Sequence, residues 1–276
     1  METNQIQLVT AFFDINRHKV DGRKNSEYAK QLVVLLKEFP STLLITDRKS
    51  FESLNLHHRH HLITTRDSLW PFSMRDEVAR ILSNFEPGKA KDITHRLPDY
   101  SLVNISKLPL MLLALERTGA TTAVWLDAGI SRFFPPGKST EVQLLNKVRE
   151  LNEMGFESGF EIETTGNISL FTGRLRNAQP GSCRRIVSGT SFFATKAYLK
   201  ALELEARLEI ERWFQSNTWD NDQVLLRRII PKMRHKTFFH RQRGEPASIL
   251  RWLLSPTDVS SEELAFSKRI SKKIGN

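Results

Sequence analysis

Short apolar runs alternate with segments of helical spacing along most of the chain. The run Gln7–Phe13 predicts a buried strand, and Thr42–Thr46 and His61–Thr65 predict two more. A helix is expected between the first two strands, with Asn25 or Ser26 as its N-cap. Its apolar residues recur every three or four positions: Tyr28, Leu32, Leu35, Leu36 and Phe39. This strand–helix–strand order favours a parallel crossover unit.

A helix–strand unit follows near the middle of the chain. Ser106 is expected to cap a helix with Pro109 in its first turn, and Gly119 to end it. The run Thr121–Leu126 then predicts a strand, which ends directly before Asp127. Open α/β sheets bind ligands outside the carboxyl ends of their strands, so a carboxylate at this position is a candidate site residue.

The same alternation continues beyond this unit. A capping-box pattern at Thr140 and Gln143 precedes a predicted helix that ends at Gly155. The runs Ile168–Thr172 and Ser188–Thr195 predict two further strands.

The strongest helical periodicity covers Lys196–Phe214, and Asp220 is expected to cap one more helix that ends before Pro231. No linker rich in proline, glycine or serine divides the chain. The pattern therefore predicts a layered α/β fold and a single domain over residues 1–266. Residues 267–276 carry lysine and arginine without any acid and are expected to form a mobile basic tail.

Composition narrows the function classes. The chain has 276 residues, of which 39% are hydrophobic and 26% charged, and this excludes collagen-like, disordered and coiled-coil proteins. The only cysteine, Cys183, excludes an internal disulfide and a cysteine-based zinc finger, and it favours a reducing compartment. The segment Met1–Thr10 lacks the pattern of a signal peptide, and the longest uncharged apolar run, Leu108–Leu115, is too short to span a bilayer. A cytoplasmic location is expected.

The net charge of +10 is concentrated toward the C-terminus. Between positions 224 and 251, one acid accompanies eight cations: Arg227, Arg228, Lys232, Arg234, Lys236, Arg241, Arg243 and Arg251. Such a distribution favours an anionic partner, which includes nucleic acid, an anionic membrane and a phosphorylated substrate. The same charge distribution also fits a protein with a basic isoelectric point and no anionic partner.

Two segments place carboxylates among other polar groups. Asp127, followed by Gly129, could hold a divalent metal or a ribose hydroxyl, although an ordinary turn explains the same pattern. Asp222 and Gln223 belong to the polar segment Trp219–Gln223 at the start of a predicted helix. Capping of that helix accounts for one carboxylate, but it leaves the crowding of polar groups unexplained.

Other candidates are single residues with two interpretations each. Gly189 could let a flat ligand lie against the backbone, or it could be a bulge in a core strand. Lys107 and Arg132 could neutralise a diphosphate, or they could be ordinary surface charges. His240 could bind a metal or a phosphate, or it could be an ordinary histidine. The sequence lacks the Walker A, dinucleotide-binding, nucleophile-elbow and helix–turn–helix motifs.

Three motifs, taken in order, resemble one family. The segment Leu8–Arg17 resembles the opening motif of the HtrL/YibB (WlaTC-like) bacterial glycosyltransferases, and Asn104–Lys107 and Trp125–Ile130 resemble its next two motifs. The resemblance implies a GT-A-like, Rossmann-like mixed sheet flanked by helices on both faces. It also implies transfer of a sugar from a nucleotide-diphosphate donor, with a UDP-sugar favoured, to a hydroxyl of a surface glycan such as lipopolysaccharide, lipo-oligosaccharide or capsule.

The resemblance also implies roles for particular residues. Asp127 and His240 would hold a manganese or magnesium ion. Gly129, however, replaces the second carboxylate of the Asp-x-Asp motif of GT-A enzymes, so the sequence leaves open whether a metal is bound. Asp222 or Glu163 would serve as the acceptor base. The expected donor-binding residues are Thr10, Ala11, Phe12, Asp14, Arg17, Lys107, Trp125, Asp127, Gly129, Arg132, Gly189 and Gln223.

The expected partners follow from this assignment. They are a nucleotide sugar, a glycan or lipid-linked acceptor, and the anionic face of the inner membrane, which the basic C-terminal residues would contact peripherally. No specific nucleic acid is expected. Two alternatives stay open: a non-catalytic protein that binds an anionic polymer such as nucleic acid, and a transferase of another nucleotide-activated group.

Overall fold

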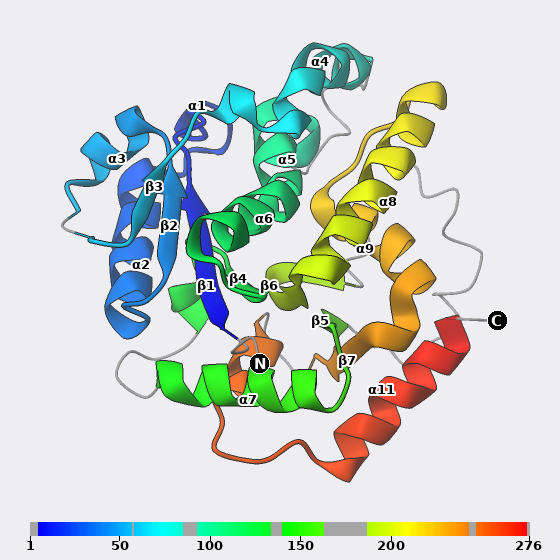
Figure 1. Ribbon diagram of the computed structural model, residues 1–276. Coiled ribbons are helices and arrows are strands. Elements are labelled where there is room, and N and C mark those ends of the chain that lie inside the picture. The colour runs from blue at the N-terminus through cyan, green and yellow to red at the C-terminus, as the bar shows by residue number, and fades with distance from the viewer. Residues whose placement is uncertain are drawn as a thin grey trace.

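The computed structural model describes residues 5–56, 58–84, 93–133, 140–162, 187–242 and 247–274. Seven strands form one sheet in the order β3-β2-β1-β4-β6-β5-β7, with β3 and β7 at its two ends (Figure 1). β6 is antiparallel to both of its neighbours, and the other neighbouring pairs are parallel. The strands are β1 (Ile6–Phe12), β2 (Leu43–Thr46), β3 (His61–Ile63), β4 (Thr122–Leu126), β5 (Ser158–Ile162), β6 (Val187–Thr195) and β7 (Thr237–Arg241).

Helices cover both faces of this sheet. Two apolar clusters divide the core, and successive residues of β1 alternate between them: Val9 belongs to the first cluster and Leu8 to the second. The helices are α1 (His18–Asp21), α2 (Asn25–Glu38), α3 (Arg48–Leu54), α4 (Arg75–Ser83), α5 (Pro98–Ile105), α6 (Lys107–Thr118), α7 (Glu141–Glu153), α8 (Lys196–Gln215), α9 (Asp222–Ile229), α10 (Ser248–Leu253) and α11 (Ser261–Ile274). The mixed α/β class with helices on both faces is confirmed.

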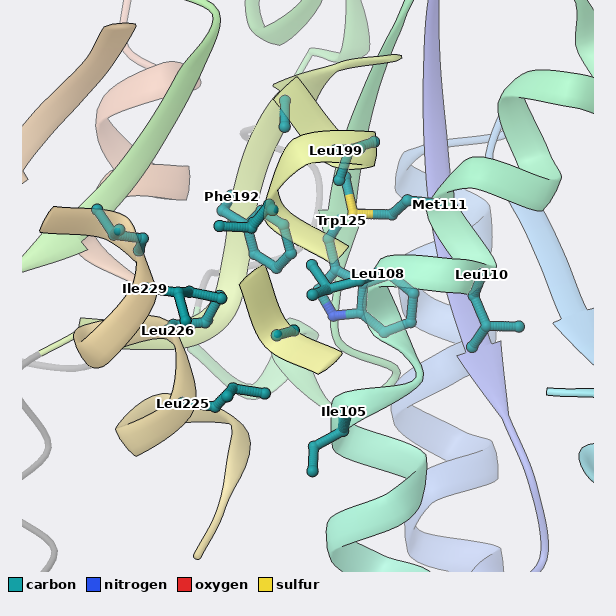
Figure 2. Close-up of a cluster of buried hydrophobic side chains, with 14 of the residues drawn as sticks. Ile105, Leu108, Leu110, Met111, Trp125, Phe192, Leu199, Leu225, Leu226 and Ile229 are labelled. Atoms are coloured by element: carbon teal, nitrogen blue, oxygen red, sulfur yellow. The ribbon is translucent and has the colours of Figure 1, made fainter. Parts of the chain in front are cut away.

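The first cluster joins α4, α5, α6, α8 and α9 to the sheet. Figure 2 shows part of it, where Leu108 and Met111 of α6 and Leu199 of α8 surround Trp125 and Phe192 of the sheet. The second cluster packs α2, α7 and α10 against the other face. Burial of a side chain such as leucine contributes about 1.5–3 kcal/mol, so these two layers hold the strand ends firmly in place.

The connections between strands create a reversal of strand order beside β1. The chain runs from β1 through α2 to the parallel strand β2, and then to β3, as the crossover pattern predicts. It then returns through α4, α5 and α6 to form β4 on the other side of β1, also in parallel. The carboxyl ends of β1 and β4 are therefore neighbours at a switch point, where open α/β sheets leave a crevice for ligands.

Several predicted helix caps are wrong. The cap of α9 is Asn221 rather than Asp220: its backbone is extended, and its side chain accepts hydrogen bonds from the backbone N–H groups of Gln223 and Val224. The Asp220 carboxylate instead accepts from the Asn221 N–H. Thr140 is the N-cap residue of α7, as predicted, but its side chain makes no capping hydrogen bond.

The predicted N-cap of α2 lies one or two residues too late in the chain. Lys24 is its N-cap and makes no side-chain capping bond, so neither Asn25 nor Ser26 caps it. By contrast, Thr195 caps α8, because its side chain accepts from the N–H of Tyr198. Glycines at positive φ end α6 at Gly119 and follow α7 at Gly155, as expected.

Residues 267–274 belong to a helix that packs on the fold, which corrects the expectation of a mobile tail from residue 267. α11 runs through this boundary, and the buried Ser267 hydroxyl accepts a hydrogen bond from the backbone N–H of Phe239 in β7. Phe266 and Ile270, four positions apart, are buried on the same side of the helix. Two apolar positions among many cations gave too weak a period to predict this helix.

The predicted strand Ile168–Thr172, and also Glu163, Cys183 and Arg243, lie outside the described residues. Within the described ranges, no helix combines the length and the hydrophobicity needed to cross a membrane.

Candidate functional site

A cavity of about 160 Å³ opens at the carboxyl ends of β1 and β4, at the switch point. β1 and the residues after it form one wall, and the residues that follow β4 form another. α2 and α5 supply aromatic side chains from above the strand ends. The described lining residues are Ala11, Phe12, Phe13, Ile15, Arg17, Arg23, Asn25, Tyr28, Tyr100, Val103, Asn104, Lys107, Trp125, Asp127, Ala128, Gly129, Ile130, Arg132, Phe133 and Thr190.

A buried lysine lies at the base of this cavity. The Nζ of Lys107 is 2.8 Å from Asp222 Oδ2, 2.8 Å from the carbonyl oxygen of Gly189 and 3.1 Å from Asp127 Oδ1. Asp127 also accepts a 2.7 Å hydrogen bond from Trp125 Nε1. An ammonium group has three N–H donors, so all of the donors of Lys107 have protein acceptors.

The two carboxylates bound to Lys107 differ in exposure. The side chain of Asp222 is 9% exposed, whereas that of Asp127 is 30% exposed. Asp127 therefore reaches the cavity, and Asp222 lies behind Lys107. We name this arrangement of Lys107, Asp127 and Asp222 the lysine–aspartate cluster.

The backbone explains why the cluster can be so compact. Position 189 is glycine because a Cβ atom there would overlap the carboxylate of Asp222. At Gly129, by contrast, a Cβ atom would make ordinary contact with the Tyr28 ring. Packing therefore requires glycine at position 189. At position 129, beside Asp127, an alanine side chain could be accommodated without a steric clash.

The cluster shifts the pKa of its members. Burial alone would lower the pKa of the Lys107 ammonium, but the charges of Asp127 and Asp222 outweigh burial and raise that pKa. Burial raises the pKa of the Asp127 carboxyl, and the negative charge of Asp222 acts in the same direction, against Lys107 and the Trp125 hydrogen bond. Lys107 is therefore a permanent cation at neutral pH.

Positive charge dominates the described lining of the cavity, where Arg17, Arg23, Lys107 and Arg132 face one carboxylate, Asp127. Arg17 is held on two sides. Its Nε donates a 2.8 Å hydrogen bond to Asp21, and its guanidinium lies 4.5 Å from the centre of the Tyr100 ring. This leaves its terminal nitrogens for an anionic ligand.

The structure brings together eight of the twelve expected donor-binding residues. The eight that line the cavity are Ala11, Phe12, Arg17, Lys107, Trp125, Asp127, Gly129 and Arg132. The other four lie elsewhere. Thr10 is buried within β1, and Asp14 borders a separate hollow beside α3. The carbonyl oxygen of Gly189 accepts a hydrogen bond from Lys107, and Gln223 lies in the first turn of α9.

His240 lies apart from the cavity. It belongs to the edge strand β7, three strands away from β4, and a strand spacing of about 4.8 Å places the two about 14 Å apart across the sheet. Its ring stacks on Trp252, with 5.1 Å between the centroids. In this structure Asp127 and His240 cannot share one ion, because metal–ligand bonds are about 2.0–2.6 Å long.

Several residues that line the cavity were not predicted from the sequence. Tyr28 was interpreted as a core position of its helix, and α5 was not predicted at all. Tyr100 and Val103 of α5 were not predicted, and they line the cavity beside Asn104 and Lys107, which belong to a motif noted in the sequence. Val103, Asn104 and Lys107 lie three, four and seven positions after Tyr100, which places all four on one side of a helical segment. This spacing was the signal that could have identified Tyr100 and Val103.

No model of a known protein family matches the chain, and comparison with curated proteins gives no match. The resemblance to the HtrL/YibB family therefore stays a prediction. Among solved structures, a cytidylyltransferase from Leptospira borgpetersenii is 11% identical, with 99% of this chain and 98% of that one covered and a TM-score of 0.44. A galactosyltransferase, LgtC, with donor and acceptor sugar analogues is 8% identical, with 98% and 95% covered and a TM-score of 0.42. These similarities do not identify an activity.

Proposed function

We propose that this chain is a glycosyltransferase that moves a sugar from a nucleotide-diphosphate donor to an acceptor hydroxyl. The observation that supports the proposal is the cavity at the switch point, where four cations face one carboxylate and tyrosine and tryptophan rings form the walls. A nucleotide diphosphate combines a flat ring with two or three negative charges, and such a cavity complements both features.

The proposed chemistry needs two kinds of electrostatic help. Transfer places positive charge on the sugar ring and negative charge on the leaving diphosphate. We assign the leaving group to Arg17, Arg23 and Arg132, which line the cavity. Asp127, whose side chain is partly exposed there, would face the sugar or the acceptor. Asp222 and Glu163 stay proposals for the acceptor base, and the contact of Asp222 with Lys107 leaves it poorly placed for that role.

We further propose that the donor is a UDP-sugar and that the acceptor is a surface glycan or its lipid-linked precursor, reached at an anionic membrane. The exposed cations Lys268, Arg269 and Lys272 of α11 support the membrane contact. Each cation near anionic lipid contributes about 1 kcal/mol. Sedimentation with vesicles containing anionic lipid tests this part separately, and binding that persists after Lys268→Glu and Lys272→Glu would contradict it.

A thermal-shift screen of nucleotide diphosphates and diphospho-sugars tests the main proposal. A ligand that binds only the folded state raises the melting temperature, and we expect UDP and a UDP-sugar to do so. Asp127→Asn should abolish sugar transfer while the variant stays folded. Asp76→Asn, at an exposed aspartate in the first turn of α4 outside the cavity, is the control and should keep the activity. Tight, steeply salt-dependent binding of nucleic acid without any response to nucleotides would instead favour a polymer-binding protein.

A further inference from the structure

The resemblance to GT-A enzymes implies a divalent metal between the protein and the donor diphosphate, and the residues present do not fit one. Gly129 supplies no side-chain ligand, and His240 lies three strands away. Asp127 Oδ1 already accepts from Trp125 and Lys107, and Asp222 Oδ2 accepts from Lys107. Within the described part of the chain, no group of three histidine, cysteine or acidic side chains could hold an ion.

We infer that Lys107 takes the place of the metal: its ammonium lies between Asp127 and Asp222, where a cation would otherwise bind, and the site holds a nucleotide diphosphate without a divalent ion. This inference rests on the proposed function. Its geometry is that of an occupied cation site, with one positive nitrogen within 3.1 Å of two carboxylate oxygens and a backbone carbonyl.

The inference divides two tasks that one metal would combine. Lys107 neutralises the carboxylates, but its three N–H donors are all used by protein acceptors, so it is a positioning residue without a free donor for phosphate. Direct contact with the diphosphate then falls to Arg17, Arg23 and Arg132. Arg17 is prepared for this by its hydrogen bond to Asp21 and its stacking on Tyr100.

Calorimetric titration of UDP into the full chain, with EDTA or with manganese, tests the inference. We expect dissociation constants that agree within about twofold in the two buffers. Arg17→Gln should weaken UDP binding by about tenfold or more in both, because a hydrogen bond to a charged group is lost. Manganese that tightens UDP binding to the wild type by about tenfold or more, or that restores binding to Arg17→Gln, would overturn the inference.

A second measurement does not depend on the donor. Free manganese, followed by electron paramagnetic resonance, should stay unbound in the presence of the wild type. Lys107→Ala, which leaves two carboxylates facing each other, should gain a manganese site, whereas Lys147→Ala, the removal of another buried lysine, should not. A stoichiometric manganese site in the wild type would overturn the inference even if Lys107→Ala fails to fold. If UDP binds in neither buffer, the proposed function fails, and the manganese measurement alone decides whether Lys107 excludes an ion.

Discussion

Two lysines in this fold are buried to the same degree, but their pKa values are shifted in opposite directions. Lys107 and Lys147 are each 5% exposed, and they lie on opposite faces of the sheet. Lys107 is bound to two carboxylates, and its pKa is raised. Lys147 donates to the carbonyl oxygens of Ser255 and Thr257 and lies 5.0 Å from the centre of the Trp252 ring; burial lowers its pKa despite more distant acids.

The difference separates a structural lysine from a candidate site residue. Lys147 joins α7 to the segment after α10 with hydrogen bonds to neutral groups, and it lines none of the described cavities. Lys107 instead gathers charge from α9 and from the end of β4 at the base of a cavity. The charge of the partners, rather than burial, shows where this fold concentrates electrostatic interactions.

Replacing each lysine by methionine gives the largest expected contrast. Lys107→Met leaves two buried carboxylates without their cation, which costs about 3–5 kcal/mol of unfolding free energy. Lys147→Met loses hydrogen bonds to neutral carbonyls and keeps its apolar stem, which costs about 1 kcal/mol. Urea unfolding at pH 7 measures both. Equal losses would show that the lysine–aspartate cluster adds nothing to an ordinary buried lysine.

The sequence predicted β1, β2, β3, β4 and β6 and the position of Asp127 because these depend on local patterns, but it did not predict β5 or β7. β1, β2 and β4 are mostly apolar runs, and β6 ends in an apolar stretch that includes Phe192 and Phe193. The switch point itself depends on the order of strands in the sheet, which the sequence did not show. The partnership of Lys107 with Asp222 was not predictable, since 115 residues separate them and the packing of α8 against both α6 and α9 brings their helices together. Propensity also does not distinguish between adjacent residues that are both good helix caps, so Asp220 was predicted in place of Asn221.

Stability at alkaline pH tests the effect of burial on Tyr198, a titratable group that has no ionic partner among its contacts within the described residues. Tyr198 is buried, and its hydroxyl lies 2.8 Å from that of Thr237; burial raises its pKa to about 12. The unfolded chain loses this proton near pH 10 and the folded chain near 12, so stability falls across that interval, by about 2–3 kcal/mol at its upper end. Lys107, with its raised pKa, adds loss in the same direction above about pH 10.5. The contribution of Tyr198 is measured by comparing the unfolding free energies of the wild type and Tyr198→Phe from pH 8 to 11.5. Parallel curves would contradict the raised pKa of Tyr198.

Two glycines sharpen the difference between the cluster and the cavity beside it. Gly189→Ala forces the Asp222 carboxylate away from Lys107 and should cost about 1–3 kcal/mol, the usual range for overpacking. Gly129→Ala adds a methyl group in ordinary contact with Tyr28 and should change stability by less than about 0.5 kcal/mol. Thermal unfolding compares the two. A destabilised Gly129→Ala would show that this position serves the fold rather than a ligand.

The smallest expected effect concerns the pH dependence of the lysine on the other face. The pKa of Lys147 is lower in the folded chain than the usual value of about 10.4, so the folded state releases this proton first as the pH rises. The unfolded state then binds more protons, and the Lys147 contribution to stability rises with pH until the unfolded lysine also titrates. Lys107 behaves in the opposite way, because its stabilisation is complete below pH 10.5 and declines above it.

Relative to the wild type, Lys147→Met should therefore lose stability progressively between pH 8 and 10.5, by a few tenths of a kcal/mol. Because Lys107 is unaffected in this interval, a measured difference of the other sign would mean that Lys147, too, has an ionic partner in solution.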